Sequence, residues 1–325
     1  MFRKTLILTL LVALLAACAP APSTPVVDSA PTDAAATEAV ATEAATESAA
    51  YLVTSDGLGR EVTLAAPAER VVSLAPSTTE ILFAVGAGAQ VVGRDEFSDY
   101  PAEAAAIESV GGSMGEYSVE SIVALEPDLV LAAEINTPEL VSQLEELGLT
   151  VFYVNNPTTI EEMYGSLENV AALTGHDASE LIDALKARVA AVDEKIAPIS
   201  ARPSVFYEID ASDPAKPYTY GPGTFGNLLI ERAGGYNIGS EAADMYPQLS
   251  LEQIVVTNPS IILLGDSMWG VTPESVLTRE GWGEIEAVKS SQVFPIDDNL
   301  ISRPGPRLVD GLEALAKILH PGLFP

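Results

Sequence analysis

Apolar and polar residues follow the same fourteen-residue pattern at two places in the chain. Residues 118–131 and residues 250–263 are identical at six of these fourteen positions. In each copy a Ser stands where a helix N-cap belongs, a Glu follows in the first turn, and a Pro ends about two turns of apolar residues. The short apolar run after the Pro is typical of a strand buried on both faces. Each copy therefore predicts a helix that leads into a strand of a parallel sheet.

The duplication predicts two lobes of similar build, because apolar runs alternate with helical segments on both sides of each copy. Residues 51–64 predict an antiparallel hairpin. In the first half we expect strands at residues 70–75, 91–93, 128–132 and 150–154, and in the second half at residues 204–209, 260–264 and 293–296. The predicted fold class is α/β, with two similar Rossmann-like lobes joined by a single long helix.

The predicted linking helix lies between the two halves, at residues 177–196. Leu181, Leu185, Val189 and Val192 recur there at helical spacing, Asp177 is placed to cap the helix, and the helix would be about 30 Å long. That length suits a strut between two lobes. The sequence thus predicts an N-terminal lobe at residues 51–174, a linking helix at 175–198 and a C-terminal lobe at 199–325.

The first fifty residues differ in composition from the rest. Residues 1–18 combine Arg3 and Lys4 with a short apolar stretch and end at Cys18, the only cysteine of the chain. This pattern predicts a lipoprotein signal peptide whose lipobox cysteine, Cys18, becomes lipidated; an ordinary signal peptide with an incidental cysteine is the alternative. Residues 19–50 contain little besides Ala, Thr, Glu, Pro and Ser, and predict a disordered tether. We therefore expect an extracytoplasmic protein anchored to the cell membrane.

Charge and composition exclude several classes of function. The formal net charge is −30, which argues against nucleic acid as a partner because phosphates need a basic surface. One cysteine allows no internal disulfide, and two histidines supply few ligands for an imidazole-rich metal site. The sequence predicts no cofactor and no metal site of the protein's own.

Two glycine-containing motifs are weak indications of an active site or a phosphate-binding site. Residues 111–115 match G-x-S-x-G, which would make Ser113 the nucleophile of a hydrolase, with His320 as a conceivable base. That motif requires a strong strand directly before it, and residues 104–110 predict none. Residues 221–226 match G-x-G-x-x-G, but Pro222 removes a backbone N–H from the phosphate cradle that the motif would build. A loop that borders a cleft is the better interpretation of both.

Four aromatic residues lie in predicted loops, outside the apolar faces of the elements: Phe97, Tyr117, Tyr246 and Trp269. In open α/β sheets, ligands bind beyond the carboxyl ends of the strands. Two facing lobes would bring these rings into one cleft and offer an apolar platform to a large flat ligand. The alternative is that each ring packs under its own loop.

The two copies of the repeat also present a matched pair of acids. Glu120 and Glu252 occupy equivalent positions in the first turns of the two repeated helices. Each could simply compensate the helix dipole, at about 0.3–1 kcal/mol. The alternative is a docking role, in which one carboxylate per lobe fits a pseudo-symmetric partner with two basic sockets.

Several stretches taken together resemble the solute-binding lipoproteins of ABC importers for cobalamin, ferric siderophores and haem, the class III periplasmic binding proteins. They are the lipobox, the tether, the 56–60 turn, residues 70–80, residues 97–101, the two repeats, the long helix and residues 303–307. The resemblance runs from residue 52 to the C-terminus. It implies limited closure of the two lobes on a ligand, and docking of Glu120 and Glu252 on arginines of an ABC permease dimer.

The resemblance also implies ligand contacts near Phe97, Ser113, Tyr246 and Arg303. Residues 97–101 and 246–248 look most like those of cobalamin-binding members, although the loop at Ser113 lacks the Trp that stacks on the corrin ring. The full set of predicted ligand-binding residues is Ser77, Phe97, Ser113, Met114, Tyr117, Phe225, Tyr246, Trp269, Asp298 and Arg303.

The sequence thus predicts a monomeric, non-enzymatic receptor that captures a metal chelate and delivers it to an ABC permease. A corrinoid is the first expectation for the ligand, and a ferric siderophore or haem the second. Two alternatives remain at this point: an extracytoplasmic serine hydrolase that uses Ser113, and a ligand sensor without transport.

Overall fold

The computed structural model describes residues 50–324, which belong to one compact unit. The predicted signal peptide with Cys18, and all but the last residue of the predicted tether, lie outside the described residues. Within residues 50–324, no helix has the length and apolar character needed to cross a membrane.

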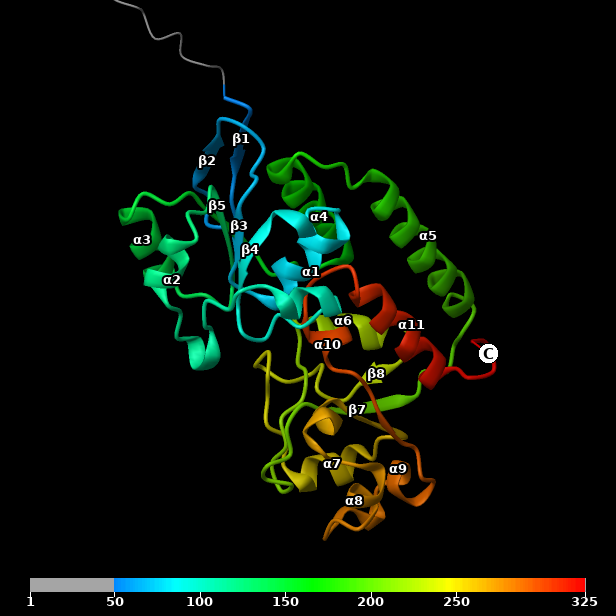
Figure 1. The fold of residues 1–325 in the computed structure, drawn as a ribbon. Coiled ribbons are helices and arrows are strands. Elements are labelled where there is room, and N and C mark those ends of the chain that lie inside the picture. Colours follow the sequence, from blue (N-terminus) through cyan, green and yellow to red (C-terminus); the bar gives the residue numbers. More distant parts are fainter. Residues whose placement is uncertain (1–49, 325) are drawn as a thin grey trace, which may run out of the picture. The chain divides into compact units, whose positions relative to one another are not determined.

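The N-terminal lobe is built on a four-stranded parallel sheet in the order β4-β3-β5-β6. Its strands are β3 (Val71–Ser73), β4 (Val91–Arg94), β5 (Leu129–Ala133) and β6 (Val151–Val154), and its helices are α1 (Pro76–Ala84), α2 (Val119–Ala124), α3 (Pro138–Glu146) and α4 (Ile160–Thr174). Strands β1 (Leu52–Ser55) and β2 (Glu61–Leu64) form the predicted antiparallel hairpin. Figure 1 shows this hairpin beside the lobe.

The C-terminal lobe is a second four-stranded parallel sheet, in the order β10-β9-β7-β8. Its strands are β7 (Ser204–Glu208), β8 (Tyr236–Asn237), β9 (Ile261–Leu264) and β10 (Val293–Pro295), and its helices are α6 (Phe225–Arg232), α7 (Leu251–Thr257), α8 (Pro273–Leu277), α9 (Glu286–Lys289), α10 (Asn299–Ser302) and α11 (Leu308–Leu319). The sequence analysis missed β8, α8, α9 and α10, because elements of two to five residues are too short to show a period.

The two copies of the repeat occupy equivalent places in the two sheets. Strand β5 lies between β3 and β6, and β9 lies between β7 and β10. The match extends to the backbone: Glu126 and Asn258, each directly before the Pro of its copy, both adopt positive φ, at 46° and 51°. A residue before Pro is disfavoured in the right-handed helical region, so the left-handed turn ends both helices at the same point. The predicted duplication of the lobes is confirmed.

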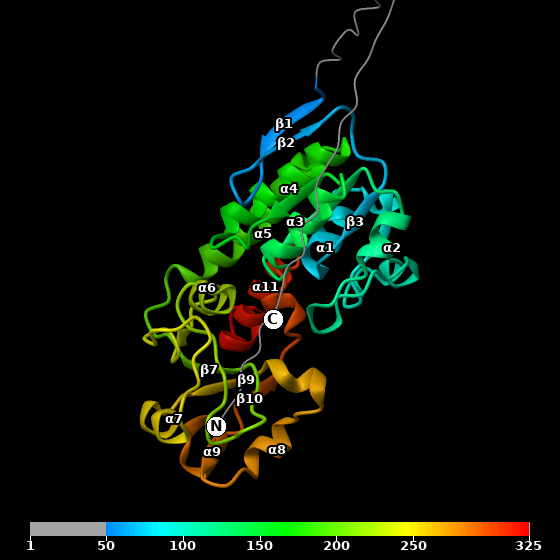
Figure 2. The same cartoon turned by 90° about the vertical axis from the view of Figure 1, so that its left-hand side faces the viewer.

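The long helix α5 (Ser179–Ile196) is packed against both lobes along its length. In Figures 1 and 2 it runs beside α4 and reaches α11, and both helices contact it. Its apolar residues Leu185, Val189 and Val192 are buried in a hydrophobic cluster that includes strands and helices of both lobes. Because this core is shared, α5 joins the lobes as part of a continuous packed layer.

One detail of the α5 prediction was wrong. The helix begins at Ser179 with Ala178 as its N-cap, and Ala178 makes no side-chain capping bond. The carboxylate of Asp177 accepts hydrogen bonds from the backbone and hydroxyl of Ser179, so it closes a local turn before the helix. An Asp that bonds two residues ahead looks the same in sequence as one that caps a helix.

Candidate ligand site between the lobes

The carboxyl ends of both sheets border two adjoining cavities of about 270 and 460 Å³. Together they are called the inter-lobe cavity here. Glu134 and Ile209 directly follow β5 and β7, and Asn156 is the second residue after β6. Tyr246 comes from the loop that precedes α7. The two parts share six lining residues, contributed by both lobes: Glu134, Asn156, Met245, Tyr246, Ser302 and Pro304. This is the position at which open α/β sheets bind ligands.

Three tyrosine rings lead from the core of the C-terminal lobe to the surface of the cavity. The ring centroids of Tyr207 and Tyr220 are 4.8 Å apart, and those of Tyr220 and Tyr246 are 6.1 Å apart. The hydroxyls of Tyr207 and Tyr220 donate to Oδ1 of Asp298 at 2.7 and 2.9 Å. Burial and the charge of Asp298 raise the pKa of Tyr220 well above its usual value. Tyr246 is 56% exposed, so its ring is an apolar surface held in place from behind.

The cation at the cavity, Arg303, is held in an ion-pair network that joins the lobes. Its Nη1 donates to Asp99 at 2.7 Å and to Glu80 at 3.2 Å, and its Nη2 donates to the carbonyl of Phe97. The buried Glu80 carboxylate also accepts from Nε of Arg307 at 2.8 Å, and the guanidinium of Arg307 lies 3.9 Å from the centre of the Tyr100 ring. The charge of Arg303 is therefore matched by carboxylates of the other lobe.

Five of the ten predicted ligand-binding residues line the inter-lobe cavity: Ser77, Phe225, Tyr246, Asp298 and Arg303. Phe97, in a loop, is 50% exposed, and Trp269, at the end of the short 3-10 helix Gly265–Trp269, is 79% exposed, but neither is among the lining residues. Ser113 lies in the turn Ser113–Gly115, also away from the lining set, and the side chain of Met114 is outside the described part of the structure.

Tyr117, one of the predicted ligand-binding aromatic residues, forms hydrogen bonds within the N-terminal lobe. Its hydroxyl donates to the carbonyl of Leu74 at 2.8 Å and accepts from the amide of Asn136 at 2.8 Å. Burial, with a further contribution from the charge of Asp95, raises the pKa of Tyr117 to about 12. The ring therefore fixes the loop after β3 to the loop after β5, close to two strand ends that border the cavity.

The hydroxyl of Ser113 forms no hydrogen bond to a His, Asp or Glu side chain in the described structure. Gly112, before it, adopts φ 108°, and no strand runs directly into the turn. His176 contacts the Thr174 carbonyl at 2.9 Å, and Nε2 of His320 lies 3.3 Å from the carbonyl of Gly234 in the other lobe. Among residues 50–324, no three His, Cys, Asp or Glu side chains are grouped so that they could hold a metal ion.

The two repeated glutamates are both exposed. Glu120 follows the N-cap Ser118 of α2, whose hydroxyl accepts from the backbone N–H of Ser121. Glu252 follows the N-cap Ser250 of α7, where Ser250 and Gln253 form a capping box. In the described structure neither carboxylate forms an ion pair. The two lobes thus present equivalent carboxylates to solvent at the starts of equivalent helices.

Sequence reasoning missed several residues of the cavity. Glu134 and Asn156 each lie two residues after the end of a predicted strand, so applying the strand-end rule to polar as well as aromatic residues would have found them. Tyr220 and Met245 could not be found in this way. They lie in long loops of the C-terminal lobe, where no periodic pattern indicates which side chains turn inward.

The architecture defines a class of protein: two parallel-sheet lobes, joined by a packed helix, that face one cavity. Comparison with known proteins gives the family. The model described as "Periplasmic binding protein" matches residues 71–300. The chain is 36% identical over 276 residues to the uncharacterized ABC transporter substrate-binding lipoprotein YvrC of Bacillus subtilis, covering 83% of this chain and 85% of that protein.

Two further comparisons bear on the ligand. The chain is 32% identical over 279 residues to a cobalamin-binding protein of Halobacterium salinarum, covering 82% of this chain and 73% of that protein. The periplasmic haem-binding protein BhuT, solved with two haems, superposes with a TM-score of 0.71 at 25% identity, covering 79% of this chain and 100% of that chain.

The chain belongs to the periplasmic binding protein family, in its class III, whose members are non-enzymatic solute-binding proteins. It is an extracytoplasmic substrate-binding protein of the ABC-importer group that serves vitamin B12, siderophores and haem. The predicted family, fold class and lack of enzymatic function are therefore confirmed, and the hydrolase alternative is not supported.

Proposed function

We propose that this protein captures a corrinoid in the inter-lobe cavity and delivers it to the permease of an ABC importer. The observation that carries the choice of ligand is the charge of the cavity. Glu134 and Asp298 line it, and Arg303 is the one cation among its described lining residues. Because Arg303 is already paired with Glu80 and Asp99, the cavity has no uncommitted positive charge.

An anionic chelate would bind poorly in such a cavity. A carboxylate that leaves water without a cationic partner loses its hydration and gains little in return, and Glu134 would repel it. Haem carries two propionates. The rim of a corrinoid carries uncharged amides, which donate hydrogen bonds to carboxylates and need no cation. The relative from Halobacterium salinarum, which is named as cobalamin-binding, supports the same choice.

The apolar part of the cavity suits a flat macrocycle. Tyr246 and Met245 are both half exposed at the C-terminal lobe, and Ile135 is 65% exposed at the N-terminal lobe. These three side chains line one cavity from opposite lobes, so a flat ligand between them would have an apolar surface on both sides.

Delivery requires a partner and an anchor. The exposed pair Glu120 and Glu252 supports docking on a permease dimer, because equivalent carboxylates on two similar lobes fit a partner with two equivalent basic sockets. Lipidation at Cys18 would keep the receptor at the membrane next to that permease. The protein would act as a monomer.

Thermal unfolding with a panel of ligands tests the proposed function. Vitamin B12, haemin and a ferric hydroxamate siderophore are each added to the purified protein at equal concentration. A ligand present at 100 times its Kd stabilises the folded state by about 2.7 kcal/mol, which is easily measured. We expect vitamin B12 to give the largest upward shift of Tm. A shift with haemin and none with vitamin B12 would overturn the choice of a corrinoid.

A further inference from the structure

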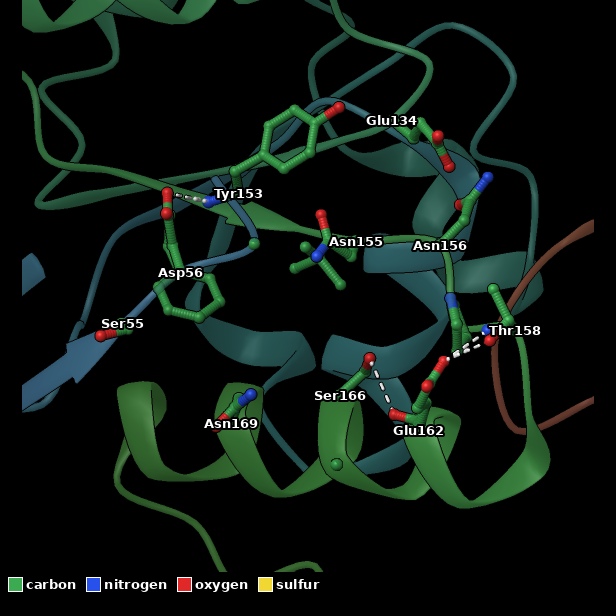
Figure 3. A pocket seen from close by; sticks show the side chains of 15 residues that line it. Ser55, Asp56, Glu134, Tyr153, Asn155, Asn156, Thr158, Glu162, Ser166 and Asn169 are labelled. Atoms are coloured by element: carbon green, nitrogen blue, oxygen red, sulfur yellow. Dashed lines mark hydrogen bonds between the residues drawn. The ribbon is translucent and has the colours of Figure 1, made fainter. Parts of the chain in front are cut away.

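A third cavity, of about 680 Å³, opens in the N-terminal lobe next to the inter-lobe cavity. It is called the side chamber here. Residues 55–57 of the hairpin, residues 152–156 at the end of β6 and one side of α4 enclose it (Figure 3). Glu134, Asn156, Pro157 and Thr158 line both the side chamber and the inter-lobe cavity. The two spaces are therefore neighbours with a common wall, and none of the predicted ligand-binding residues belongs to the side chamber.

Two carboxylates that line the side chamber are hydrogen-bonded to other protein groups and hold its elements together. The Asp56 carboxylate accepts from Arg60 and from the backbone N–H of Tyr153, which fixes the hairpin to strand β6. The Glu162 carboxylate accepts from the backbone and hydroxyl of Thr158 at 2.6 and 2.9 Å, which fixes the loop to α4. These hydrogen bonds lower the pKa of Glu162, so it stays ionised.

The remaining carboxylate and amide side chains of the lining form no hydrogen bond or ion pair within the described chain: Glu134, Asn155, Asn156 and Asn169. Figure 3 shows that they come from different elements around one space, with Asn169 on α4, Asn155 and Asn156 after β6, and Glu134 after β5. The described lining contains no Lys, Arg or His. The side chamber therefore offers a carboxylate and several amides, a set that pairs with neutral amides and repels carboxylates.

A glycine in the middle of α4 leaves this space open. Gly165 is the sixth residue of the fifteen-residue helix and lines the side chamber. A Cβ added at Gly165 would meet no atom within 4 Å, so neither packing nor backbone strain requires a glycine there. Glycine is a poor residue for a helix interior because it loses the most conformational freedom on folding. A glycine at this position leaves room for a bound group, which would account for its presence in the helix.

We propose that the side chamber binds an amide-bearing side arm of the captured chelate. The inference rests on the proposed function and extends it to a second subsite. The NH2 of the arm donates to the carboxylate of Glu134 or to an Asn carbonyl, and the arm's carbonyl accepts from an Asn NH2. An arm that ends in a carboxylate is disfavoured, because Glu134 repels it and no lining cation balances it.

Filling the side chamber from α4 is the first test. Gly165→Leu extends into open space, and leucine favours a helix, so the variant should unfold at the same temperature as the wild type or higher. Its affinity for vitamin B12, measured by titration calorimetry, should fall by about tenfold or more, equal to about 1.4 kcal/mol. Gly283→Leu is the matched control, since a Cβ at Gly283 also meets no atom within 4 Å and Gly283 lines neither cavity.

Changing the ligand is the second test. Monocarboxylic acids of vitamin B12 each carry one propionate in place of a propionamide. The wild type should bind at least one of them about tenfold more weakly than vitamin B12, and Glu134→Gln should narrow that difference. If the wild type binds all the acids as tightly as vitamin B12, or if Gly165→Leu binds vitamin B12 as tightly as the wild type, the proposed role of the side chamber is wrong. Neither result would contradict a corrinoid as the ligand. If no corrinoid binds to the wild type, the proposed ligand is wrong, and so is the proposed role of the side chamber.

Discussion

The ion-pair network between the lobes gives a stability prediction that can be worked out from the structure. Glu80, on α1, has a fully buried side chain, and its two partners Arg303 and Arg307 are 13% and 12% exposed. Glu80→Gln keeps the shape of the side chain and removes its charge, which leaves the largely buried guanidinium of Arg307 without a carboxylate partner. Breaking a buried pair by removing one partner costs about 3–5 kcal/mol.

The cost should lie at the lower end of that range, because Arg303 keeps its contacts with Asp99 and with the carbonyl of Phe97. We expect a loss of about 3 kcal/mol, which for a unit of this size lowers Tm by about 5 °C. Urea unfolding followed by circular dichroism measures the free energy, and calorimetry measures Tm.

The matched control is Glu284→Gln. Glu284 pairs with Lys289 at 2.8 Å, but the two side chains are 80% and 49% exposed, and exposed pairs contribute little. The control should unfold like the wild type. If Glu80→Gln also unfolds like the wild type, the network does not hold the lobes together, and the inference that Arg303 is unavailable to an anionic ligand loses its basis.

Three further predictions concern the ligand platform, a buried acid and the docking pair. Tyr246→Ala should weaken vitamin B12 binding by about tenfold in titration calorimetry with little change in Tm, since the ring is half exposed; unchanged affinity would remove Tyr246 from the site. Burial, followed by the charge of Glu208, raises the pKa of Asp266 to about 7. Its unfolded pKa is about 3.9, so the folded protein loses stability as the pH rises through the interval from about 4 to about 7, at about 1.4 kcal/mol per pKa unit. The fall in the urea midpoint from pH 4.5 to pH 8 that Asp266 causes should therefore be absent in Asp266→Asn. The same change of midpoint with pH in both proteins would contradict this. Glu120→Lys with Glu252→Lys should reduce uptake of vitamin B12 by cells while binding to the purified protein is unchanged; normal uptake would contradict the docking role.

The repeated lobe could be predicted from sequence because its signals are local. The Ser caps, the first-turn Glu residues and the two Pro stops act within a few residues of where they stand, and the apolar runs directly mark the buried strands β5 and β9. Strand β8, with two residues, carries no such signal and exists because it pairs with β7. Tertiary pairing decides elements of that length.

The candidate site was only partly predictable, for a different reason. Tyr246 could be identified because an aromatic residue in a predicted loop is conspicuous, and it lines the cavity. The role of Arg303 could not be read from sequence, since its partners Glu80 and Asp99 lie more than two hundred residues away in the chain. The side chamber was missed because its amides and Gly165 are unremarkable until the fold brings the hairpin, β6 and α4 together.

The charge of the inter-lobe cavity is the central claim, and the ratio of two dissociation constants tests it most directly. Vitamin B12 and haemin are titrated separately into the same preparation of the full-length protein. We expect vitamin B12 to bind with one-to-one stoichiometry and at least about tenfold more tightly than haemin, a difference of about 1.4 kcal/mol or more. Tighter binding of haemin would show that the cavity accepts anionic chelates, and would contradict the account.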